Sequence, residues 1–98
     1  MIEEAFVSQD IAKRLREKGF SDEPIEGYMP TQQRAMRWLR EEKGIFLQIV
    51  MGYGDNYDYR VWKNREYVPR EEDDEIEFET YELAVAFGLL FVLTKMDI

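Results

Sequence analysis

Residues 45–62, IFLQIVMGYGDNYDYRVW, decide the fold of this 98-residue chain. Residues 45–51 and 57–62 both alternate with the two-residue period of a β-strand. The five residues between them, GYGDN, have the composition of a turn. We therefore expect an antiparallel hairpin, and we expect its first strand to be buried on most of both faces because the apolar residues of 45–51 occur at both parities.

Helical periodicity flanks the hairpin on both sides. Ser8, Thr31 and Thr80 each precede a stretch with helical spacing and are residue types that cap helix N-termini. Gly19 and Gly44 follow the first two of these stretches and predict their ends, because glycine readily adopts the left-handed conformation that terminates a helix. The sequence thus predicts two helices before the hairpin and one after it.

A short third strand is expected at residues 66–68, where Pro69 would end it. Residues 21–30 contain two prolines and a glycine and predict a connecting loop. These elements predict an α+β fold of order ααββ(β)α: two N-terminal helices, an antiparallel hairpin or three-stranded meander, and a C-terminal helix, with the helices on one face of the sheet. Residues 1–98 are expected to form a single domain, with an acidic loop at residues 70–79.

The chain contains neither histidine nor cysteine. It therefore lacks the usual near-neutral general base, the thiolate nucleophile and the commonest zinc or iron ligands. Ser8 and Ser21 are the only serines, and no base of the customary kind is present to activate them. Carboxylates are abundant, but nothing marks a pair of them as lying in a pocket. We expect a protein that is not an enzyme and has no catalytic, cofactor-binding or metal-binding residues.

The net charge of −8 disfavours a protein that binds the phosphate backbone. Residues 1–44 carry a net charge of −1, whereas residues 45–98 carry −7. The longest apolar run, residues 83–93, is about half the length of a membrane-spanning helix. The N-terminus has acidic residues where a secretory signal has basic ones, so a cytoplasmic protein without a membrane association is expected.

The segment from Pro30 to Glu41, PTQQRAMRWLRE, resembles small proteins of gut Bacteroidetes and of their phages or mobile elements. Those proteins typically have an Ile-Ala-containing first helix that ends in Lys-Gly-Phe, an aromatic-rich hairpin, and a last helix entered through Thr-Tyr-Glu. The corresponding pieces here are Ile11-Ala12, Lys18-Gly19-Phe20 and Thr80-Tyr81-Glu82. The resemblance covers most of the chain. It implies a genomic setting but no activity, because that family is uncharacterised.

The last helix is apolar on all sides, which is typical of a buried helix. On a helical wheel, Ala84, Gly88, Phe91 and Lys95 form a narrow strip opposite a broad apolar arc. Small residues four apart allow another backbone to approach closely, so Ala84, Gly88 and Phe91 could contact a second copy or another protein. Phe91→Glu would then abolish a dimer and leave the monomer folded. The alternative is that the first two helices already cover this strip. Protein–protein interaction, with a homodimer as its most concrete form, is the leading expectation.

Three arginines, Arg34, Arg37 and Arg40, follow each other at intervals of three in the second helix, with Trp38 at their flank. This spacing lines them along one side of the helix, where they could contact phosphate or a carboxylate partner. The hairpin aromatics could stack bases beside them. They are Tyr53, Tyr57, Tyr59, Trp62 and Tyr67. The alternatives are a solvated helix face and cross-strand packing. Because the chain is acidic, nucleic acid is the runner-up expectation.

The acidic run at residues 71–75, EEDDE, has three interpretations. It lacks the spaced pattern and central glycine of a calcium-binding loop. It could mimic a nucleic-acid backbone towards a basic partner. The ordinary interpretation is a solvated loop that keeps the protein in solution.

Overall fold

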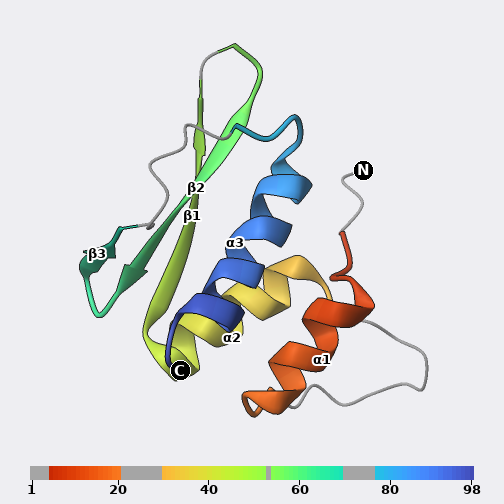
Figure 1. Ribbon diagram of the computed structural model, residues 1–98, viewed down its shortest axis with the longest axis vertical. Helices are drawn as coiled ribbons and strands as arrows, with labels where there is room; N and C mark the ends of the chain where they lie inside the picture. The colour runs from red at the N-terminus through yellow and green to blue at the C-terminus, as the bar shows by residue number, and fades with distance from the viewer. Residues whose placement is uncertain (1–4, 21–29, 53, 70–76) are drawn as a thin grey trace.

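The computed structural model describes residues 5–20, 30–52, 54–69 and 77–98. Its elements, in chain order, are α1 (Gln9–Glu17), α2 (Gln32–Lys43), β1 (Ile45–Met51), β2 (Tyr57–Lys63), β3 (Glu66–Val68) and α3 (Tyr81–Lys95) (Figure 1). The α+β arrangement expected from the sequence is confirmed, and the short third strand at residues 66–68 is present. The loop expected at residues 21–30 lies almost wholly outside the described residues.

Local capping chemistry sets the helix boundaries. The hydroxyls of Ser8, Thr31 and Thr80 each accept a hydrogen bond from the backbone N–H three residues later, at 3.1–3.2 Å. Gly19 has φ 101° and Gly44 has φ 67°, the left-handed region in which glycine carries no steric penalty. All five caps are those that the sequence predicts.

The strands form one antiparallel sheet in the order β1-β2-β3. Gln48 lies opposite Arg60 in the β1–β2 register, and Trp62 lies opposite Tyr67 in the β2–β3 register. Phe78 extends the β3 side of the sheet, because its backbone N–H and C=O both pair with Tyr57, at 2.7 and 2.8 Å. The sheet therefore has β2 at its centre and β1 along one edge.

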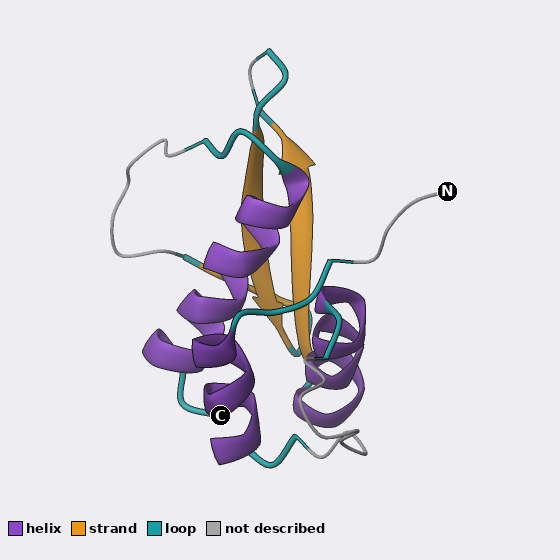
Figure 2. Cartoon of the chain, turned by 90° about the vertical axis from the view of Figure 1, so that its right-hand side faces the viewer, coloured by secondary structure: helices purple, strands orange, loops and turns teal. Residues whose placement is uncertain are grey.

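The helices lie against one face of this sheet. Helix α3 packs on β1 and β2, α2 packs on β1, and α1 packs on α3. Figure 2 shows α3 running alongside the two long strands. The side chains of Ile45, Leu47 and Val61 point toward the helices and are almost completely buried. Burial of apolar side chains between the helices and this single face supplies the core.

One expectation about burial was wrong. Strand β1 is buried on one face only, and Phe46 on its other face is 44% exposed. The reason is that all three helices occupy the same side of the sheet. Within the predicted acidic loop, Phe78 is buried and pairs with Tyr57 of β2, and Asn56 donates a hydrogen bond to Glu77 at 3.1 Å. The rest of the predicted acidic loop, residues 70–76, lies outside the described residues.

In the part of the chain that the structure describes, no helix combines the length and apolar character needed to cross a bilayer.

Candidate functional site

The small residues of α3 are buried within the fold. Ala84 has an exposed fraction of 0%, and Gly88 is also buried. A Cβ atom built on Gly88 would lie 2.6 Å from Cδ1 of Leu47, so glycine is what allows β1 to approach the helix. Phe91 is half-buried, with its ring 6.0 Å from that of Tyr59. The expected interface of Ala84, Gly88 and Phe91 is thus wrong as an outer strip, because this fold already covers two of its three members.

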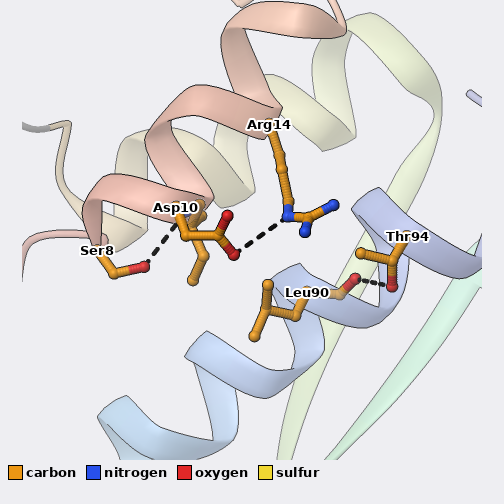
Figure 3. Close-up of polar contacts among 6 residues, drawn as sticks. Ser8, Asp10, Arg14, Leu90 and Thr94 are labelled. Carbon is orange, nitrogen blue, oxygen red and sulfur yellow. Dashed lines mark hydrogen bonds and ion pairs between the residues drawn. The ribbon is translucent and has the colours of Figure 1, made fainter.

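The outer side of α3 carries other apolar residues. Leu83 is 43% and Phe87 49% exposed, and the Phe87 ring stacks on Phe78 at 4.9 Å. Figure 3 shows polar contacts where α1 and α3 lie side by side, and each contact drawn stays within one helix. Arg14 donates to Asp10 at 3.1 Å within α1, for example. The α1–α3 contact therefore rests on the apolar side chains that α1 buries.

The arginines and the tryptophan that were predicted to form a patch on α2 do not form one surface. Arg37 donates through Nε to Glu41 at 2.9 Å, and this hydrogen bond and the carboxylate charge raise the pKa of its guanidinium. Trp38 is half-buried, with its ring edge-on to Phe20 at 5.4 Å and the Lys43 ammonium 5.5 Å from its centre. Trp38 thus packs against apolar and cationic neighbours of its own and does not join the exposed arginines in one surface.

Arg40 lies instead beside the sheet face on which none of the described helices packs. It borders a shallow hollow of about 780 Å³ that spans the end of α2 and the two long strands. The residues lining this hollow are Arg40, Gly44, Phe46, Gln48, Trp62, Asn64 and Arg65. The hollow brings an arginine of the predicted patch together with an aromatic of the predicted hairpin, Trp62.

A row of aromatic rings runs across the three strands on this side. Phe46 of β1 lies opposite Trp62 of β2, and Trp62 lies opposite Tyr67 of β3. The rings of Trp62 and Tyr67 are 5.3 Å apart at an interplanar angle of 62°. Trp62 donates its indole N–H to Oε1 of Gln48 at 3.0 Å, which holds the indole in place. We call Phe46, Gln48, Arg60, Trp62 and Tyr67, with the hollow, the open sheet face.

The local charge of the open sheet face is opposite to that of the chain. Arg40 and Arg65 line the hollow, and among the described residues no aspartate or glutamate lines it. Arg60 is exposed and shares the face of Trp62, since the two are separated by one residue of β2. Asp58 is at the far end of that face and accepts a hydrogen bond from the Tyr59 N–H at 2.8 Å. Among the described side chains, positive charge is therefore concentrated beside the aromatic row, although the net charge of the chain is −8.

The aromatics expected in one cluster occupy opposite faces of the sheet. Tyr59 is buried against Phe78 and Phe91, and Tyr57 lies edge-on to Tyr81 at the start of α3. Tyr53 lies outside the described residues. Phe46 was missed by the sequence interpretation because β1 was expected to be buried on both faces. The signal that could have found Phe46 is the alternation of side chains along the strand. In the β1–β2 register Phe46 lies opposite Trp62, so Phe46 and Gln48 share a face of the sheet with Trp62.

No group of three or more metal-binding side chains is present within residues 5–20, 30–52, 54–69 and 77–98. Comparison of the chain with protein-family models, with curated proteins and with solved structures gives no match. The open sheet face is accordingly interpreted from its own geometry.

Proposed function

We propose that this protein is a non-enzymatic binding module whose open sheet face holds single-stranded nucleic acid. The observation that carries the proposal is the row of three aromatic rings beside three arginines, two of which line the same hollow. In this proposal the protein is a cytoplasmic accessory factor of a phage or mobile element.

The aromatic row favours unpaired bases over a duplex. Aromatic side chains on a sheet surface can stack on the faces of bases, and those faces are accessible only when the strand is single. Phe46 and Tyr67 are 44% and 49% exposed, so their rings are open to contact. Each base stacked in this way contributes about 1–3 kcal/mol. Three rings across three strands suit a short contact of two or three bases.

The polar groups in the hollow complement this arrangement. Arg40 and Arg65 supply cationic groups for phosphate, and guanidinium groups bind phosphate oxygens through paired N–H donors. Gln48 and Asn64 bring amide groups that can donate to and accept from the edges of bases. The acidic remainder of the chain would repel a long phosphate backbone, so the contact is expected to be local.

The salt dependence of binding tests the role of the arginines. Binding of a fluorescently labelled ten-nucleotide oligothymidine can be followed by anisotropy. We expect the logarithm of the binding constant to fall with the logarithm of the salt concentration at a slope of about −2, because three arginines release at most about 0.7 counterions each. Arg40→Ala and Arg65→Ala should each reduce the magnitude of this slope by about 0.7. Arg37→Ala is the matched control, because Arg37 is on α2 but pairs with Glu41 away from the hollow.

Replacement of an aromatic ring tests the stacking contact. Tyr67→Ala should weaken binding by about 1–3 kcal/mol, and Tyr67→Phe should retain most of the affinity because it keeps the ring. Absence of binding at low salt, or slopes that do not differ among the wild type, Arg40→Ala and Arg65→Ala, would contradict the proposal.

A further inference from the structure

The carboxamide of Gln48 has a fixed orientation on the open sheet face. The indole N–H of Trp62 can only donate, so the Gln48 atom that lies 3.0 Å from it is the amide oxygen, Oε1. The amide nitrogen, Nε2, is therefore on the other side of the carboxamide, with both of its N–H donors. An amide without such a neighbour can turn over and present either atom. The contact with Trp62 thus determines which group Gln48 offers to a ligand.

The Nε2 atom of Gln48 is accessible and is not used within the fold. None of the described residues accepts a hydrogen bond from it. No side-chain nitrogen or oxygen of the described residues is both buried and unpaired, so this nitrogen is open to solvent. Gln48 also lines the hollow, together with Phe46 and Trp62. Two N–H donors are therefore free beside the rings of the hollow.

The other polar side chains of the hollow are mainly donors as well. Arg40 and Arg65 carry N–H donors and no acceptor. Asn64 directs its amide oxygen toward Gly44, since a Cβ atom built on Gly44 would lie 2.5 Å from Oδ1. Among the described side chains that line the hollow, none is a carboxylate or a hydroxyl. A ligand in the hollow is therefore bound best through acceptor atoms.

The turn that holds Arg65 has an unusual backbone conformation. Asn64 and Arg65 are the two residues between β2 and β3, and both have positive φ, 50° and 71°. This is the two-residue hairpin turn whose second position usually holds glycine. An arginine there is held against its local conformational preference, and residues in such conformations are found at ligand-binding sites. The turn independently indicates that the guanidinium beside the hollow contacts a ligand.

We infer that the hollow selects bases that carry a ring carbonyl, namely uracil, thymine and guanine, over the amino bases cytosine and adenine. This inference rests on the proposed binding of single-stranded nucleic acid. Where uracil and thymine have the acceptor O4, cytosine has the donor N4–H₂, and guanine O6 and adenine N6–H₂ differ in the same way. A carbonyl oxygen accepts from Nε2 of Gln48, whereas an amino group there would leave two donors facing each other unpaired. Because cytosine retains its O2 carbonyl, the selection is expected to be modest.

Oligodeoxyuridine and oligodeoxycytidine of ten nucleotides test this selection, because they match in the number of phosphates and in ring size. We expect the wild type to bind oligodeoxyuridine about fivefold more tightly at low salt in the anisotropy assay. In Gln48→Glu the carboxylate still accepts from Trp62 but has no donor, so the preference should vanish or reverse. The added negative charge weakens binding to both strands, so the readout is the ratio of the two dissociation constants.

Trp62→Phe tests whether the indole N–H sets the orientation of Gln48. This variant keeps a ring in the aromatic row but frees the carboxamide to turn over, so the ratio should fall below about twofold. Tyr67→Phe is the matched control. It also loses one polar group and keeps its ring, but it is on β3, whereas Gln48 is on β1, and it should retain the wild-type ratio.

Each outcome separates the selection from the proposed binding itself. Equal affinity of the wild type for the two strands, or a preference for oligodeoxycytidine, would overturn the selection and leave the binding site standing. A ratio that stays at the wild-type value in both Gln48→Glu and Trp62→Phe would overturn the role of Gln48. Absence of binding to either strand at low salt would contradict the selection and the proposed function together.

Discussion

Substitution of Gly88 tests directly which way α3 faces. In an exposed helix interior, Gly→Ala stabilises by about 1 kcal/mol, because alanine has the better helix propensity. In this fold the new Cβ would lie 2.6 Å from Cδ1, 3.0 Å from Cδ2 and 3.3 Å from Cγ of Leu47. Leu47 is almost fully buried, so Gly88→Ala must displace either the packed Leu47 side chain or the helix itself.

The two effects have opposite signs and can be compared. Overpacking a core by one methyl group costs about 1–3 kcal/mol, against the gain of about 1 kcal/mol from helix propensity. With three atoms of one buried side chain in the way, we expect the overpacking cost to exceed the gain. Gly88→Ala should therefore lower the free energy of unfolding by about 1 kcal/mol.

Urea denaturation followed by far-ultraviolet circular dichroism measures this change. Ala86→Gly, at a half-buried position of the same helix, calibrates the propensity contribution. Leu47→Ala alone should cost about 2–5 kcal/mol, and in the double variant the methyl group added by Gly88→Ala should occupy part of the vacated space. The double variant should thus be more stable than the sum of the single changes predicts, by at least about 0.5 kcal/mol. Stabilisation by Gly88→Ala alone, with additive behaviour in the double variant, would refute the orientation of α3.

Three further changes in stability follow from the packing and are measured by the same denaturation assay. Phe91→Glu should lower the free energy of unfolding by about 3 kcal/mol, because the ring packs beside Tyr59; an unchanged stability would mean that Phe91 lies outside the core. Phe78→Ala should cost about 3–5 kcal/mol through loss of its contacts with Tyr59 and Phe87, and a cost below about 1 kcal/mol would contradict its burial. Thr80→Ala should cost about 1 kcal/mol by removing the N-cap of α3, whereas Thr80→Ser should cost less.

The elements of this fold could be predicted because their signals are local. A capping hydroxyl needs only the N–H three residues along the chain, and the glycine at a helix end needs only its own φ angle. Ser8, Thr31 and Thr80 therefore appear where their sequence context indicates, as do Gly19 and Gly44. The hairpin likewise follows from a two-residue period on both sides of a glycine-rich turn.

The orientation of α3 could not be predicted in the same way. A helix that is apolar on every side has no polar face to indicate which side meets solvent. The strip of Ala84 and Gly88 was consistent with close approach of any backbone, and the structure shows that at Gly88 the approaching element is β1 of the same chain. Leu83 and Phe87 remain exposed to solvent because of this tertiary contact, and the helix sequence alone does not indicate it.

The open sheet face was only partly predictable for a related reason. Arg40 and Trp62 were both singled out in the sequence, but they are twenty-two positions apart and meet only because α2 leads directly into β1. Trp38, next to the arginines in sequence, turns toward Phe20 instead. Tyr59 and Trp62 are on opposite faces because side chains alternate along a strand and the two residues are three positions apart. Which of the two faces the helices cover is decided by tertiary packing.

The most direct test of the central claim is a titration of the ¹⁵N-labelled protein with unlabelled ten-nucleotide oligothymidine at low salt, followed by two-dimensional amide NMR. We predict that the largest shift changes occur at Phe46, Gln48, Trp62, Asn64, Arg65 and Tyr67, including the indole N–H of Trp62. The outer side of α3, at Leu83 and Phe87, should serve as the internal control with little change. No shift changes at low salt, or changes concentrated on α3, would contradict the assignment of the open sheet face as a site for single-stranded nucleic acid.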